Sequence, residues 1–200
     1  MRQIVSCVLS ALLVFTMPMV LAFAADGVEY LSPTVGDDGT VSFSTETTTS
    51  AEAITDTTTA LGEDDSNEHW YVVNGAVEIT TRITVTGDVH LILADGATLN
   101  ASAGITVEGS NSLTIYAQST GDDMGKLVAT ATSVGKSTGS SAGIGGTAGS
   151  NAGTITINGG NITATGGSST GEYVGTGAGI GGGGSYNSTA GSGGTIIIND

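Results

Sequence analysis

Few residues of this sequence are suited to acid–base or metal chemistry, and the best group lies in the middle of the chain. Asp122 and Asp123 precede Lys126, and a polysaccharide lyase needs such a set, because carboxylates hold calcium and a basic residue abstracts a proton. The alternative interpretation of residues 121–125 is a polar turn between two strands. We favour the turn, since only three basic residues follow residue 24. No catalytic residue is therefore predicted.

A second acidic group runs from Glu63 to Glu68 and includes Asp64 and Asp65. Calcium prefers several oxygen ligands, so both groups offer weak candidates for an optional calcium ion: Asp64, Asp65, Asp122 and Asp123. The second group lacks the glycine-turned spacing of a dedicated calcium loop, and a hydrated acidic run is the favoured interpretation. His90 stands in an alternating strand pattern, where it is expected to point outward or to have a partner. No cofactor is predicted.

Aromatic residues are the better candidates for binding, because aromatic rings stack on the apolar faces of sugars. The tentative ligand-binding residues are Trp70, Tyr71, Tyr116, Tyr173 and Tyr186. For Trp70 and Tyr71, the favoured alternative is a cap over the first turn of a repeat structure. Tyr173 and Tyr186 lie in long glycine-rich insertions, where loops often carry function. For these two, binding and a passive loop position are equally supported.

The composition excludes several classes of protein. The 200 residues include 33 glycines and four lysines or arginines, with a formal net charge of −15. Nucleic-acid binding needs a basic patch against the phosphates, so it is not expected. Collagen is excluded because the glycines show no three-residue period. With 38% hydrophobic residues, the chain has enough apolar material for a folded core.

The first 24 residues are typical of a secretory signal peptide. Arg2 is followed by an apolar run that ends at Ala22-Phe-Ala24, a small-residue cleavage site. A membrane anchor is the alternative, because about 20 apolar residues can cross a bilayer. Cleavage would remove Cys7, the only cysteine. The mature protein is thus expected to be secreted, either free or attached to the cell wall through a later segment, with no membrane span and no disulfide.

Residues 25–68 form an acidic leader rich in threonine and serine. Apolar residues are few there and follow no helical or strand period over a useful length. This pattern predicts a largely disordered spacer, with at most a loosely attached strand pair around Val41 and Phe43.

Internal repeats dominate residues 69–200. Gly153-Thr-Ile-Thr-Ile-Asn158 recurs as Gly194-Thr-Ile-Ile-Ile-Asn199, and Ala142-Gly-Ile-Gly-Gly146 recurs as Ala178-Gly-Ile-Gly-Gly182. Each repeat holds three short strands, and degraded copies extend back to Trp70. The predicted strands, in chain order, are 70–73, 77–80 and 83–86; 90–94, 97–100 and 104–108; 113–117, 127–131 and 142–145; and 154–158, 162–165 and 178–181.

Three strands in a fixed order without helical periodicity predict an all-β, right-handed parallel β-helix. In such a solenoid Ile155 would stack on Ile196 and Ile157 on Ile198, about 4.8 Å apart. Asn158 and Asn199 would form a ladder at equivalent corners. A β-sandwich is the alternative, but it would not predict the three-strand order. The pattern stops in mid-repeat at residue 200, so we expect this repeat region to be incomplete.

The repeat region resembles the right-handed parallel β-helix (pectate-lyase-like) surface proteins of gut-type Gram-positive bacteria, many of them described as adhesin-like or carbohydrate-binding. The similar stretch is carried by Trp70-Tyr-Val-Val-Asn-Gly75, by residues 83–96 and by the two repeated glycine motifs. The resemblance implies a secreted or wall-displayed protein that contacts polysaccharides or the glycans of a host or cell wall. It transfers no site residues.

The sequence therefore predicts a non-catalytic, secreted or cell-surface protein that binds carbohydrate or mediates adhesion. A passive structural stalk of a larger surface protein is the alternative. A polysaccharide lyase or hydrolase is the less favoured third hypothesis.

Overall fold

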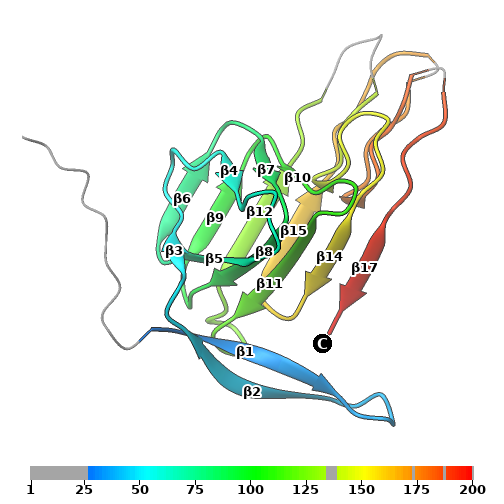
Figure 1. Ribbon diagram of the computed structural model, residues 1–200. Coiled ribbons are helices and arrows are strands. Elements are labelled where there is room, and N and C mark those ends of the chain that lie inside the picture. Colours follow the sequence, from blue (N-terminus) through cyan, green and yellow to red (C-terminus); the bar gives the residue numbers. More distant parts are fainter. Residues whose placement is uncertain (1–26, 134–138, 173, 187, 200) are drawn as a thin grey trace, which may run out of the picture.

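The computed structural model describes residues 27–133, 139–172, 174–186 and 188–199, and every regular element within them is a β-strand (Figure 1). Fifteen of the strands form three parallel sheets, and the other two form an antiparallel hairpin. Nothing in these described ranges is a helix long and apolar enough to cross a membrane.

Successive strands of the chain belong to different parallel sheets. The first sheet contains β3 (Glu52–Ala53), β5 (Glu68–Val73), β8 (Asp88–Leu93), β11 (Ser112–Ala117), β14 (Thr154–Ile157) and β17 (Thr195–Ile198). The second contains β6 (Ala76–Ile79), β9 (Thr98–Ala101), β12 (Lys126–Thr130) and β15 (Asn161–Thr165). The third contains β4 (Ala60–Leu61), β7 (Ile83–Val85), β10 (Ile105–Thr106), β13 (Ile144–Gly145) and β16 (Ile180–Gly181). From β5 onward the chain visits the first, second and third sheets in turn and then returns to the first sheet one strand further along.

The predicted stacking of neighbouring repeats is confirmed. Ile155 pairs with Ile196 and Ile157 with Ile198 in the parallel register of β14 and β17. At the corner that follows, Asn199 Nδ2 donates a hydrogen bond to the side-chain oxygen Oδ1 of Asn158 over 2.7 Å. Equivalent residues of successive repeats therefore lie directly beside one another.

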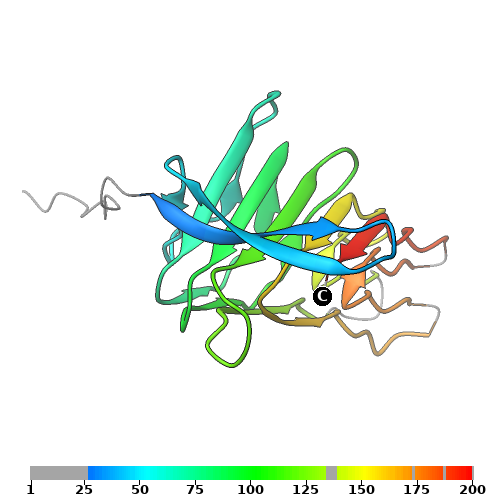
Figure 2. The same ribbon diagram turned by 90° about the horizontal axis from the view of Figure 1, so that it is seen from below.

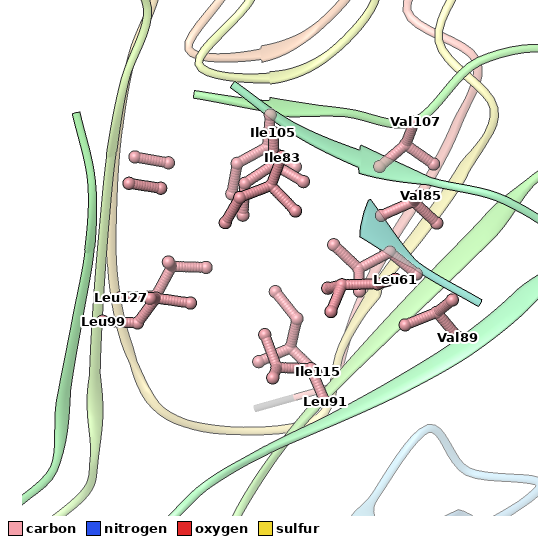
Figure 3. Close-up of a cluster of buried hydrophobic side chains, with 14 of the residues drawn as sticks. Leu61, Ile83, Val85, Val89, Leu91, Leu99, Ile105, Val107, Ile115 and Leu127 are labelled. Carbon is pink, nitrogen blue, oxygen red and sulfur yellow. The ribbon is translucent and has the colours of Figure 1, made fainter. Parts of the chain in front are cut away.

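Aliphatic side chains from all three sheets fill the space between them (Figure 3). Because alternate residues of a strand point to opposite faces, Leu91 and Ile115 of the first sheet face the interior, where they meet Leu99 of the second and Ile83 of the third. All four are completely buried. Removing this apolar surface from water is the main force that holds the repeats together.

The structure contradicts the disordered spacer predicted for the acidic segment before residue 69 and agrees with the alternative, a strand pair that includes Val41 and Phe43. β1 (Val28–Val35) and β2 (Val41–Thr48) form an antiparallel hairpin, which crosses the outer face of the first sheet (Figure 2). β3 and β4 add one strand each to the first and third sheets, so parallel pairing begins before residue 69. The few apolar side chains of this segment explain its order, since Val28 is buried against the sheet. The predicted signal peptide, residues 1–24, lies outside the described residues.

The glycine-rich motifs occupy stacked turns of the third sheet. Gly145 and Gly181 adopt φ values of +130° and +133°, which glycine reaches without the steric cost of a Cβ. The amide of Gly146 donates to the Gly181 carbonyl over 2.8 Å. A Cβ atom on Gly145 would lie 2.1 Å from that same carbonyl oxygen. The two glycine motifs therefore pack backbone against backbone at this point, which leaves no room for a side chain on Gly145.

Candidate binding site on the outer face of the first sheet

Two groups of outward-facing side chains meet on the first sheet. The first, which we call the polar strip, consists of residues in register on five neighbouring strands: Glu68, Asp88, Ser112, Thr154 and Thr195. The second, the aromatic cluster, consists of Tyr30, Trp70, His90 and Tyr116. Both groups face outward because the residues that alternate with them, such as Val89 and Leu91, are buried in the core.

The aromatic cluster joins the hairpin to the sheet. Tyr30 of β1 lies 4.9 Å from Trp70 and 4.8 Å from Tyr116, measured between ring centroids. The Trp70 and His90 rings are stacked, with centroids 4.3 Å apart and planes 16° from parallel. His90 Nδ1 and the Tyr116 hydroxyl are 3.0 Å apart. Burial raises the pKa of Tyr116 to about 12, and the oxygen of its hydroxyl can accept a hydrogen bond from Nδ1–H of His90.

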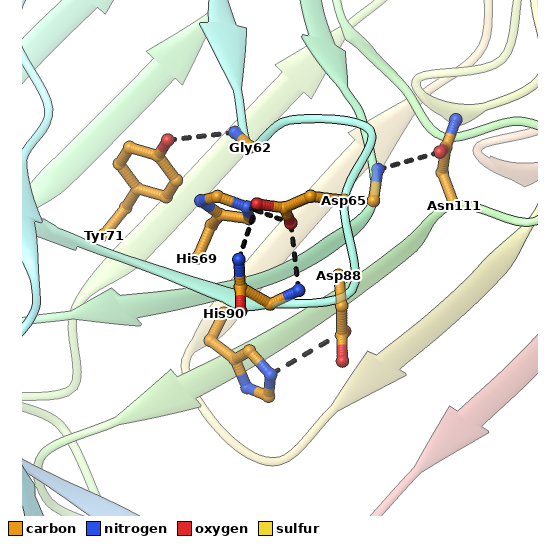
Figure 4. Close-up of polar contacts among 9 residues, drawn as sticks. Gly62, Asp65, His69, Tyr71, Asp88, His90 and Asn111 are labelled. Carbon is orange, nitrogen blue, oxygen red and sulfur yellow. Dashed lines mark hydrogen bonds and ion pairs between the residues drawn. The ribbon is translucent and has the colours of Figure 1, made fainter.

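The polar strip meets the aromatic cluster through two pairs of side chains. Trp70 Nε1 donates to Glu68 Oε2 over 3.2 Å, and His90 Nε2 lies 3.7 Å from Asp88 Oδ1 (Figure 4). His90 Nε2 is buried without a hydrogen-bond partner. Ligand atoms of Glu68, Asp88 and His90 all lie within 4.8 Å of one another, the one such group of histidines and acids that the described residues contain. These three side chains are therefore the candidates to hold a metal ion.

A separate polar network occupies the loop between β4 and β5. His69 Nε2 lies 2.9 Å from Asp65 Oδ1, and Asn67 donates to both oxygens of the same carboxylate (Figure 4). The hydrogen bond from His69, followed by those from Asn67, lowers the pKa of Asp65 to about 2. Asp64, the other predicted calcium ligand of this loop, is exposed. The oxygens of Asp65 are thus already occupied by its own loop.

The predicted aromatic residues do not form one platform. Tyr116 is only 8% exposed, and Trp70 is half-buried. The half-buried Tyr71 packs against the core and accepts a hydrogen bond from the Gly62 amide. Tyr186 lies on the loop after β16, is 43% exposed and forms an isolated bridge with Val174. Tyr173 lies outside the described residues.

The alternative prediction, that Trp70 and Tyr71 cap the exposed edge of the first turn, is wrong, because β5 is not the edge strand of its sheet. β3 pairs with β5 on the far side, with Glu52 beside Tyr71. The two aromatic residues therefore lie inside the first sheet rather than at its edge. Trp70 is covered by the hairpin instead.

Asp122 and Asp123 lie on the exposed loop between β11 and β12. The backbone carbonyl of Asp123 accepts a hydrogen bond from the Gly96 amide over 2.8 Å. This is the polar turn that the sequence favours. The structure does not bring the two side chains together with Glu68, Asp88 and His90.

Sequence reasoning missed Glu68 and Asp88 as site residues and treated His90 as an ordinary strand residue. A signal was present, because Glu68-His-Trp70 and Asp88-Val-His90 start equivalent strands. Each strand thus begins with a carboxylate that is followed two residues later by an aromatic ring on the same face.

Comparison of the chain with models of protein families, with curated proteins and with solved structures found no match.

Proposed function

We propose that this protein is a secreted or cell-surface parallel β-helix, right-handed and wound through three sheets, that binds carbohydrate or mediates adhesion without catalysis. Its partners would be polysaccharides or the glycans of a host or cell wall. Support for the fold comes from the order in which the chain enters the three parallel sheets. Function does not follow from fold alone, so the binding proposal rests on the site.

The observation that carries the proposal is the polar strip beside Trp70. Carboxylate and hydroxyl oxygens from Glu68 to Thr195 repeat along five strands in register, at the roughly 4.8 Å spacing of neighbouring strands. A regular row of hydrogen-bonding groups is suited to a polymer that repeats its own hydroxyls.

The engagement of Arg82 supports a binding role over a lyase reaction. Its guanidinium donates hydrogen bonds to the backbone carbonyls of Ala103, Ile105 and Ala142 and to the Thr106 hydroxyl. Because Nε and both Nη atoms of Arg82 donate hydrogen bonds within the protein, this side chain is held as a structural cation rather than as a free base for a substrate proton. Lys126 belongs to β12 of the second sheet, away from the polar strip.

The test is a glycan-binding screen of the mature chain, with Ser112→Ala and Thr154→Val as variants of the polar strip. We expect saturable binding to at least one acidic or neutral polysaccharide and a loss of affinity of about fivefold in each variant, one hydrogen bond being worth about 1 kcal/mol. Asn100→Ala is the matched control, since Asn100 lies on a strand of the second sheet.

Assays for reducing ends and for unsaturated products accompany the screen. Binding without released product supports the proposal, and released product contradicts its non-catalytic part. Binding that survives both strip variants but disappears in Tyr186→Ala contradicts the strip as the site. No binding to any glycan overturns the binding function and favours the structural stalk.

A further inference from the structure

We propose that Glu68, Asp88 and His90 form a binding site for a divalent transition-metal ion of the zinc type. The three side chains come from the first halves of β5 and β8, which are neighbours in parallel register. They offer one imidazole nitrogen and carboxylate oxygens within 4.8 Å of one another. This inference does not depend on the proposed glycan binding.

The imidazole of His90 is already oriented for a ligand. Its side chain is 12% exposed, and its ring is sandwiched in the aromatic cluster against Trp70. In the tautomer in which Nδ1–H donates to the Tyr116 hydroxyl, 3.0 Å away, Nε2 keeps its lone pair for a metal. A hydrogen bond at one ring nitrogen that fixes the other toward a metal is the usual arrangement around a ligating histidine.

Nε2 of His90 is the polar atom of this site that lacks a partner. It is buried and makes no hydrogen bond, although buried polar atoms nearly always have one. The closest acidic oxygen, Asp88 Oδ1, lies 3.7 Å away, which is too long for a hydrogen bond. An ion between these two atoms would satisfy both the nitrogen lone pair and the carboxylate charge.

The two carboxylates are also held by neighbours. Trp70 Nε1 donates to Glu68 Oε2, and the Ser112 hydroxyl donates to Asp88 Oδ1. Glu68 keeps Oε1 for a metal, and Asp88 Oδ1 has a further lone pair beside the one that accepts the Ser112 hydrogen bond. Both side chains are exposed, so water would complete the coordination.

The donor set favours zinc over calcium or magnesium. Imidazole nitrogen suits zinc, copper and nickel, whereas calcium and magnesium prefer oxygen donors throughout. One histidine with two carboxylates and water matches the donor types that zinc accepts in four-coordinate sites.

The fluorescence of Trp70 can report metal binding at this site. Trp70 is the only tryptophan, and it contacts both His90 and Glu68. Titration of the metal-free mature chain with Zn²⁺ would be followed by calorimetry and by Trp70 emission, with no carbohydrate present. Cu²⁺ serves as a second probe, because it quenches a nearby indole. We expect one ion per chain and a saturable change in Trp70 emission.

The matched pair of variants is His90→Gln and His69→Gln, since His69 is the other histidine and is engaged by Asp65. We expect His90→Gln to weaken Zn²⁺ binding by at least about tenfold and His69→Gln to leave it unchanged. Asp88→Asn, at an exposed position, tests the site without disturbing the aromatic cluster and should also weaken binding at least about tenfold. Far-UV circular dichroism checks that each variant folds.

Three results would overturn the site: no Zn²⁺ binding, equal affinity in the Asp88→Asn variant and the wild type, or loss of binding in His69→Gln alone. Tighter binding of Ca²⁺ than of Zn²⁺ would overturn the assignment to a transition metal. Because the titration contains no glycan, an absence of metal binding would not bear on the proposed glycan binding. That proposal is tested separately, by the glycan screen and its Ser112→Ala and Thr154→Val variants.

Discussion

The indole of Trp70 lies flat on the imidazole of His90, with ring centroids 4.3 Å apart. The two residues are paired on neighbouring parallel strands, and their side chains lie beside each other on the same face of the sheet. Tyr30, which precedes Trp70 by 40 residues in the chain, completes the cluster by packing against Trp70 and Tyr116. This contact anchors an acidic segment that has few other apolar groups with which to fold.

Replacement of Tyr30 by alanine is expected to release the β1–β2 hairpin. Two aromatic contacts, each worth about 0.5–1.5 kcal/mol beyond burial, would be lost, so the docking free energy should fall by about 1–3 kcal/mol. Hydrogen exchange of the β1 amides measures this directly. Phe43→Ala is the control, because Phe43 is 36% exposed on β2. Equal exchange in the two variants would contradict the anchoring role of Tyr30.

Substitution of Gly145 by alanine is expected to destabilise the protein by at least about 1–3 kcal/mol, the usual cost of a strained backbone conformation. Gly145 has a φ of +130°, and the added Cβ would lie 2.1 Å from the Gly181 carbonyl oxygen. Urea denaturation gives the free energy of unfolding. At Gly75 a Cβ meets no atom within 4 Å, so Gly75→Ala should be nearly neutral. Similar losses at both positions would show that the stacked turn is not the cause.

Arg82→Lys is expected to lower the free energy of unfolding by about 2–4 kcal/mol. The guanidinium of Arg82 donates to three backbone carbonyls and to Thr106, and a single ammonium cannot span that set. Carbonyls left without a donor cost about 1–3 kcal/mol each when they are buried. Lys126→Met, at an exposed strand start, should change stability by less than about 0.5 kcal/mol. Thermal or urea unfolding of the two variants would separate these outcomes.

The Asp65 network predicts a loss of loop order at low pH. The pKa of Asp65 is lowered to about 2, first by the hydrogen bond with His69, whereas an unfolded aspartate has a pKa of about 3.9. A lowered pKa means that the contribution to stability is present above about pH 4 and disappears as the pH falls through about 2. Carbon-detected NMR of the Asp65 carboxyl group follows this titration.

In the same experiment His69→Gln should move the Asp65 midpoint upward, toward the unfolded value. Asn67→Ala removes only one of the two Asn67 hydrogen bonds, so its effect should be smaller. A midpoint that is unchanged in His69→Gln would contradict the assignment of His69 as the main cause.

Much of the repeat architecture was predictable because it depends on local periodicity. Alternation of isoleucine and threonine from Thr154 to Ile157 determines which side chains face inward, since successive residues of a strand point to opposite faces. Recurrence of the same motif at residues 195–198 then predicts the pairing of Ile155 with Ile196, which is confirmed. The repeated glycine motif likewise predicts stacked turns.

The acidic segment was not predictable in the same way. Val28 and Tyr30 are too few to produce a periodic pattern, and their partners Val72 and Tyr116 lie far along the chain. Whether such a segment folds depends on a surface that exists only after the three sheets have formed.

From about residue 69 onward the sequence by itself thus determined the strands, their order and the apolar interior, because each of these follows from a repeated pattern of neighbouring residues. Only the tertiary structure decided that Glu68, Asp88 and His90 converge, that Trp70 stacks on His90 and that the hairpin covers this cluster. The physical reason is that contacts between strands depend on their register, and register depends on how the intervening corners and loops pack. Residues that are 20 positions apart in the chain become nearest neighbours only when that packing is complete.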